Sequence, residues 1–151
     1  MNDIVIDLEQ TLFKHGVLGV QYKNWNSILV DHSSNVYNET HLKEFRSLIG
    51  KKRGIYVYTY DDGSTEQILY VGKSQDLASR LSVHYKERHD KIGMPRWRQF
   101  WQSHTHQMKI YYKEINVDSD SYVDEAMRII VERYMIAKLK PISENTYKSV
   151  K

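Results

Sequence analysis

Cysteine is absent from the 151 residues of this sequence, which excludes disulfide bridges and thiolate metal sites. No apolar run approaches the roughly 20 residues that a membrane-spanning helix requires. The first ten residues, MNDIVIDLEQ, are acidic and contain no apolar core, so we expect no signal peptide. These absences leave a globular chain the size of one compact domain, and we expect it to reside in the cytoplasm.

Positive charge is modest in total but unevenly distributed. The formal net charge is +3. Between Arg80 and Lys113, eight Lys or Arg residues stand against two acids, and four histidines lie in the same stretch. Such a stretch is typical either of a solvated face or of a surface that binds a polyanion.

Hydrophobic periodicity predicts a chain of mixed helices and strands. Helical spacing predicts helices over residues 3–14, 39–49, 76–87, 96–103 and 121–139. Alternation predicts strands over residues 53–60, 67–71 and 108–115, with short strands around 17–22 and 28–30. A turn cluster at residues 61–64 predicts a hairpin, and Gly72 is expected to end its second strand. We expect residues 1–50 to form an extension that packs on a domain of residues 51–151.

Three local features contain candidate catalytic or binding residues. Gly54-Ile55-Tyr56 in one strand is followed by Tyr70-Val71-Gly72 in its partner. On the helix after them, residues spaced by four line one side, so Arg80 and His84 are expected to point together, away from the core. Glu132 lies among apolar residues on the last helix and therefore needs a cation or hydrogen-bond donors.

Each of these features also has an ordinary structural interpretation. A Gly-Ile-Tyr tripeptide is common in strands, and an Arg and a His four residues apart usually lie on a solvated helix face. Glu132 could pair with Arg128 or Arg133. The order and spacing of the features, rather than any one of them, favour a functional site.

The ordered set of motifs resembles the GIY-YIG nuclease domain over about residues 53–147. The matching positions are Gly54-Ile55-Tyr56, Tyr70-Val71-Gly72, Arg80, His84, Glu132 and Asn145. With Lys73 directly after the second motif, the sequence resembles the incision subunit of nucleotide excision repair. The sequence departs from the family pattern with Val in place of Ile in the second motif, 13 residues between the motifs, and an apparent insertion at about residues 86–107.

The resemblance implies an α+β fold, with a small sheet of three antiparallel strands flanked by helices. It also implies a single divalent metal ion, Mg²⁺ or Mn²⁺, on Glu132, with water and phosphate as the other ligands. One protein carboxylate suits Mg²⁺, because this ion keeps several of its waters.

The catalytic roles follow from what phosphodiester hydrolysis requires. Arg80 would bind the phosphate with two parallel donors, which Lys could not replace. Tyr56 would be the general base, and because a free phenol has a pKa of about 10, it needs positive charge nearby. Lys73 and Arg80 are the candidates for that charge. Tyr70 and His84 would orient the water or phosphate, and Asn145 would order the site.

The surroundings of this site leave several interpretations open. The residues expected to contact DNA phosphates or bases are Arg88, Lys91, Arg96 and Arg98. The segment with Trp97, Phe100 and Trp101 is either a DNA-contacting element or a helix packed on the core. His104 and His106 are more readily explained as surface residues than as metal ligands, since no third ligand is apparent.

Three functions compete at this level. The leading one is a stand-alone restriction-type DNA endonuclease, with recognition supplied by residues 1–50 and 86–107 and with a homodimer as a possible form. The second is a structure-directed nuclease of repair, phage or mobile-element type. The third is a non-catalytic DNA-binding module of the same fold, which would have no chemical need for Tyr56, Arg80 and Glu132 together.

Overall fold

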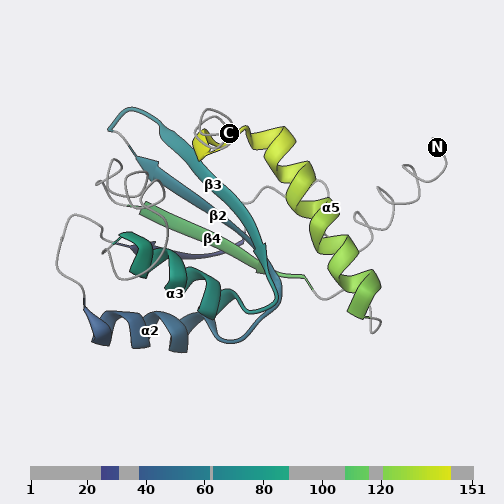
Figure 1. Ribbon diagram of the computed structural model, residues 1–151. Coiled ribbons are helices and arrows are strands. Elements are labelled where there is room, and N and C mark those ends of the chain that lie inside the picture. The colour runs from purple at the N-terminus through teal and green to yellow at the C-terminus, as the bar shows by residue number, and fades with distance from the viewer. Residues whose placement is uncertain (1–24, 31–37, 62, 89–107, 116–120, 144–151) are drawn as a thin grey trace.

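The computed structural model describes residues 25–30, 38–61, 63–88, 108–115 and 121–143. In this part of the chain, a sheet lies between one long helix on one face and two shorter helices on the other (Figure 1). The elements in chain order are β1 (Asn26–Val30), α2 (Glu39–Ile49), β2 (Gly54–Asp61), β3 (Glu66–Ser74), α3 (Leu77–Arg88), β4 (Met108–Glu114) and α5 (Ser121–Leu139). The expected α+β fold is confirmed, because helices flank an antiparallel sheet.

The sheet contains four strands in the order β1-β4-β2-β3, rather than the three that were expected. The additional strand is β1, which pairs antiparallel with β4 from Asn26 opposite Tyr112 to Val30 opposite Met108. Without it, β4 would present a row of unpaired backbone groups at the sheet edge. The short strand at 28–30 was predicted, but its partner could not be read from the sequence.

The prediction that Gly72 ends the second hairpin strand was wrong. Strand β3 continues through Gly72 to Ser74, and Gly72 lies directly opposite Tyr56 in the ladder. Glycine is required at position 72 because the Tyr56 side chain lies close to its backbone. In the sequence, such a glycine cannot be distinguished from one that ends a strand in a turn.

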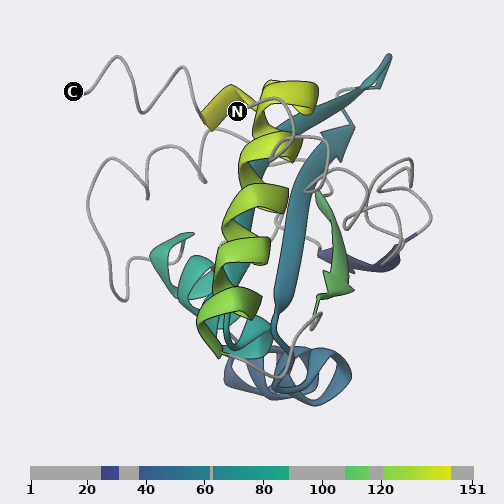
Figure 2. The same ribbon diagram turned by 90° about the vertical axis from the view of Figure 1, so that its right-hand side faces the viewer.

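Two hydrophobic cores lie on the two faces of the sheet. Tyr56, Tyr58 and Leu69 point to one face and pack with Leu77 and Leu81 of α3. On the other face, the apolar side chains of the strands pack against α5 through Met127, Val131 and Met135. Figure 2 shows α5 running along this second face. Alternation along β2 therefore sends Tyr56 toward α3, and Ile55 and Val57 toward α5.

The predicted helices at 39–49 and 121–139 are confirmed to the residue, and α3 starts one residue after its predicted start. Local signals explain their ends. Gly50, with a φ of 75°, follows the last residue of α2, and Asp76 caps α3 by accepting a hydrogen bond from the Ser79 amide at 3.1 Å. Lys140, with a φ of 51°, and Pro141 follow α5.

Helix α2 packs mainly against α3, and its last residue, Ile49, also joins the core on this face of the sheet. The Asn38 amide donates a hydrogen bond to the Tyr85 hydroxyl, and Arg46 donates one to Ser82. Helix α3 is consequently covered on two sides, by the sheet and by α2. No helix in the described ranges is long and apolar enough to cross a membrane. The helices predicted at 3–14 and 96–103 and the strand predicted around 17–22 fall outside those ranges.

Candidate active site

The glycines of both motifs are required by close backbone and side-chain approaches. A Cβ atom at Gly54 would collide with the main-chain carbonyl of Lys113 on the neighbouring strand. A Cβ atom at Gly72 would collide with the ring and hydroxyl of Tyr56, which lies across the backbone of β3 at this point. The second glycine thus makes room for the tyrosine of the first motif.

Four rings meet over this glycine, and we call Tyr56, Tyr58, Tyr70 and His84 the aromatic cluster. Tyr56 and Tyr70 stack at 5.9 Å between ring centroids and 19° between ring planes. The imidazole of His84 lies 5.2 Å from the Tyr70 ring and 5.7 Å from each of the other two rings. The two motif strands and helix α3 therefore bring together three of the residues identified from the sequence.

The expectation that His84 points away from the core was wrong. Its side chain is only 5% exposed, whereas Arg80 one turn earlier is exposed. The reason is that His84 packs against three tyrosine rings of the sheet, so the buried side of α3 is wider than its apolar stripe. The Tyr56 hydroxyl lies 2.8 Å from His84 Nε2, and His84 Nδ1 lies 3.5 Å from Glu87 Oε2.

Arg80 places its guanidinium against the hydroxyls of Tyr56 and Tyr70. Burial by itself would lower the pKa of Arg80, but interactions with these two hydroxyls outweigh that effect, and the pKa is raised. The Arg80 guanidinium thus places a permanent positive charge between the aromatic cluster and the solvent. Its planar donors can bind two oxygens of one phosphate.

Burial holds the titratable groups of the cluster in their neutral forms. It raises the pKa of Tyr56 well above its ordinary value, although Arg80 acts in the opposite direction. It also raises the pKa of Tyr70 and lowers the pKa of His84. Displaced pKa values of several groups at one place are typical of functional sites.

Glu132 approaches this site from the other layer of the fold. It lies on α5, half-buried, beside the edge strand β3, and its charge contributes to raising the pKa of Tyr70. Among the described residues, no group of three or more His, Cys, Asp or Glu side chains could hold a metal ion. The carboxylate of Glu132 is an oxygen donor of the kind that a hard, largely hydrated cation such as Mg²⁺ binds.

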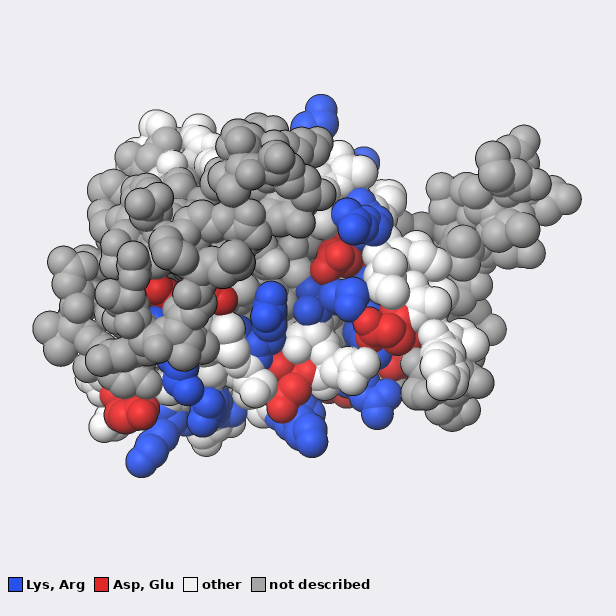
Figure 3. All heavy atoms as spheres, in the orientation of Figure 1, with Lys and Arg blue, Asp and Glu red and all other residues white. Residues whose placement is uncertain are grey.

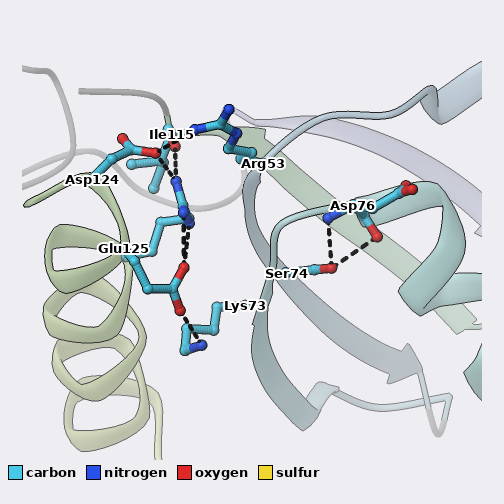
Figure 4. Close-up of polar contacts among 8 residues, drawn as sticks. Arg53, Lys73, Ser74, Asp76, Ile115, Asp124 and Glu125 are labelled. Atoms are coloured by element: carbon cyan, nitrogen blue, oxygen red, sulfur yellow. Dashed lines mark hydrogen bonds and ion pairs between the residues drawn. The ribbon is translucent and has the colours of Figure 1, made fainter. Parts of the chain in front are cut away.

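A second polar cluster anchors the start of α5, and we call it the ion-pair network. It consists of Arg53, Lys73, Asp124, Glu125 and Arg128 (Figure 4). Arg128 is 1% exposed and donates to Asp124, to Glu125 and to the carbonyl of Ile115. These contacts hold the Arg128 guanidinium at the start of α5.

Lys73 belongs to the network rather than to the aromatic cluster. Its Nζ lies 2.6 Å from Glu125 Oε1, and this hydrogen bond is the largest cause of a lowered pKa of Glu125. The charge that acts on Tyr56 comes from Arg80. Of the two cations considered for this task, the structure thus brings only Arg80 to the tyrosine hydroxyl.

The remaining candidates lie outside the described part of the chain. They are the side chain of Arg88 and the residues Lys91, Arg96, Arg98 and Asn145. On the described part of the face shown in Figure 3, Lys and Arg side chains are mixed with acidic ones. Glu87 was not among the candidate site residues, although it contacts His84. It lies three residues after His84 on one helix, a spacing at which side chains meet.

Comparison with known families agrees with this geometry. The family described as the GIY-YIG catalytic domain matches residues 52–148, more than half of the chain. The chain belongs to this family. No curated protein and no solved structure gives a match. As a GIY-YIG domain, the chain is an endonuclease that hydrolyses phosphodiester bonds, and a domain of this family implies DNA as its substrate. Tyr56 and Tyr70 of the two motifs belong to the aromatic cluster, and the motif glycine Gly72 lies against both of their rings.

Proposed function

We propose that this chain is a Mg²⁺-dependent DNA endonuclease of the restriction type. The observation that supports it most directly is the convergence of Tyr56, Tyr70, Arg80 and His84 on one face of the sheet, with Glu132 at the adjoining edge. A non-catalytic binding module would have no chemical need for Tyr56, Arg80 and Glu132 together.

Binding of the scissile phosphate is assigned to Arg80. The guanidinium is exposed on one side and held by two tyrosine hydroxyls on the other, so its orientation is fixed before DNA arrives. Fixed donors stabilise the charge that develops on phosphoryl oxygens without reorganisation during the reaction. Two parallel hydrogen bonds also orient the phosphate.

Deprotonation of the attacking water is assigned to the Tyr56 hydroxyl. Tyr70 stacks on Tyr56 and, with His84, fixes the direction of that hydroxyl. Burial keeps Tyr56 protonated at rest. The hydroxyl must therefore release its own proton as it accepts one from water, which makes its contact with His84 important.

Glu132 would hold the metal ion, with Asn145 proposed to order the site. The carboxylate is a hard oxygen donor, and a single such donor suits an ion that stays largely hydrated. When bound there, Mg²⁺ would supply Lewis-acid stabilisation of the phosphoryl and leaving oxygens.

The restriction-type assignment draws on the parts of the chain that surround the active site. Strand β1 and helix α2 add ordered surface beside the sheet and α3. The segment after α3 contributes Lys91, Arg96 and Arg98, which could contact phosphates or base edges. Sequence recognition would then come from residues that precede the first motif and follow α3 in the sequence.

Cleavage of supercoiled plasmid in Mg²⁺ and in EDTA tests this proposal. Discrete fragments from the wild type in Mg²⁺ alone are expected, and Glu132→Ala should abolish them. Glu44→Ala, which changes an exposed glutamate on α2, is the matched control and should cut normally. Smearing or nicking would contradict the restriction-type assignment. Undiminished cutting by Glu132→Ala would contradict the metal site.

A further inference from the structure

We propose that Glu87 is a positioning residue of the active site, which fixes the tautomer of His84 so that His84 Nε2 receives the proton of Tyr56. The inference rests on the proposed function, in which Tyr56 deprotonates the attacking water. It adds a residue that matches none of the family motifs identified in the sequence. The geometric basis is one line of contacts from Glu87 through His84 to Tyr56.

With Glu87 ionised, the contacts along this line allow one arrangement of protons. Glu87 Oε2 lies 3.5 Å from His84 Nδ1, and an ionised carboxylate can only accept, so the hydrogen belongs on Nδ1. A neutral imidazole then carries a lone pair on Nε2, which lies 2.8 Å from the Tyr56 hydroxyl. Tyr56 therefore donates to His84, as the relay requires.

Burial stabilises this arrangement of protons, and the arrangement decides whether Tyr56 can pass its proton to His84. Glu87 is 7% exposed and His84 is 5% exposed, so water competes little for either group. A buried imidazole without a partner for Nδ1 could rotate or adopt the other tautomer. The other tautomer places a hydrogen on Nε2, and Tyr56 could no longer pass its proton there.

The proton transfer balances as follows. The O–H bond of Tyr56 breaks and an N–H bond forms at His84 Nε2, while the tyrosine oxygen takes a proton from the attacking water. Tyr56 remains neutral throughout, and the new positive charge on His84 is stabilised by the Glu87 carboxylate. The proton leaves His84 for solvent after the DNA strand is cut.

Several groups surround His84 and set the pH at which it can act. Glu87 raises its pKa, whereas burial and the charge of Arg80 lower it. The phenols of Tyr56 and Tyr58 face it from β2, and the phenol of Tyr70 faces it from β3. Removal of Glu87 should therefore shift the acid limb of activity to lower pH.

The direct test is the tautomer of His84 in the full-length protein. Long-range proton–nitrogen spectra of histidine-labelled protein, assigned by comparison with His84→Gln, should show hydrogen on Nδ1 and a lone pair on Nε2. Glu87→Ala should lose this preference, while Glu87→Gln should keep it because the amide oxygen still accepts. Hydrogen on Nε2 in the wild type would overturn the proposal, whether or not the protein cuts DNA.

Kinetics supply a second readout that a merely structural role would not change. We expect kcat to fall about 10-fold in Glu87→Gln and up to about 100-fold in Glu87→Ala, with KM unchanged. The acid limb should move to lower pH in both, and Glu44→Gln should change neither. A loss of kcat without movement of the acid limb would contradict the inference. Absence of cleavage by the wild type would instead contradict the proposed function.

Discussion

The aromatic cluster and the ion-pair network lie on opposite faces of the same sheet and handle charge in opposite ways. In the network, Lys73 and Arg128 hold Glu125 in its charged form and lower its pKa. In the cluster, burial raises the pKa of Tyr56 and lowers that of His84, so both are neutral. The network thus uses charges that exist in the resting protein, whereas the cluster holds groups whose charge can appear during a reaction.

The largest effect is expected where the network is broken. Arg128→Ala leaves Asp124, which is fully buried, without its main partner. Loss of one partner of a buried ion pair costs about 3–5 kcal/mol. Chemical denaturation should show this loss in the free energy of unfolding, with the exposed Arg133→Ala as control. A loss below about 1 kcal/mol would mean that the network does not anchor α5.

The next effect should appear in activity rather than in stability. Arg80→Lys keeps the positive charge but loses the paired planar donors, and kcat should fall about 100-fold. Arg53→Lys makes the same change in the exposed arginine of the network and should leave kcat unchanged. Measured cleavage rates at saturating DNA distinguish the two. Full activity of Arg80→Lys would disprove the bidentate phosphate contact.

The two clusters should also lose stability in different pH windows. His84 has a folded-state pKa below its ordinary value of 6.5, so the unfolded chain binds its proton more readily. Its contribution is complete above pH 6.5 and declines as the pH falls toward the lowered pKa, by at most about 1.4 kcal/mol per pH unit. The contribution of Glu125 is present above its ordinary pKa of 4.5 and is lost only as the pH falls below it.

Unfolding measured from pH 7.5 to about 2.5 can separate these windows. His84→Gln should remove the upper part of the decline, since glutamine does not titrate, and Glu125→Gln should remove the lower part. If both variants flatten the same pH range, the distinction between the clusters is wrong.

Most of the fold could be predicted because its signals are local. Helix α5 has a capping region, an apolar stripe and a terminating proline within one stretch of sequence. The fourth strand could not be counted, because β1 joins the sheet only through pairing with β4, some 80 residues later. The role of Gly72 was missed for a similar reason, since Tyr56 creates it from another strand.

The candidate site, too, could be predicted from the sequence only in part. The motif residues were found from their order, but the orientation of His84 depends on its packing against the tyrosine rings of β2 and β3. The partner of Lys73 could not be foreseen either, because Glu125 lies 52 positions later in the chain. Sequence spacing identified which residues matter, whereas packing between layers decided what each one touches.

The smallest effect concerns Lys73, which lies one residue beyond the glycine over which the aromatic cluster forms. Lys73→Met removes a half-exposed ion pair with Glu125, and such pairs contribute about 1 kcal/mol or less. We expect a slight loss in the free energy of unfolding and less than about a threefold change in kcat, with Lys51→Met as a surface control. A fall in kcat comparable to that of Arg80→Lys would place Lys73 in the catalytic machinery. Lys73 would then connect the two clusters, and the ion-pair network could no longer be regarded as purely structural.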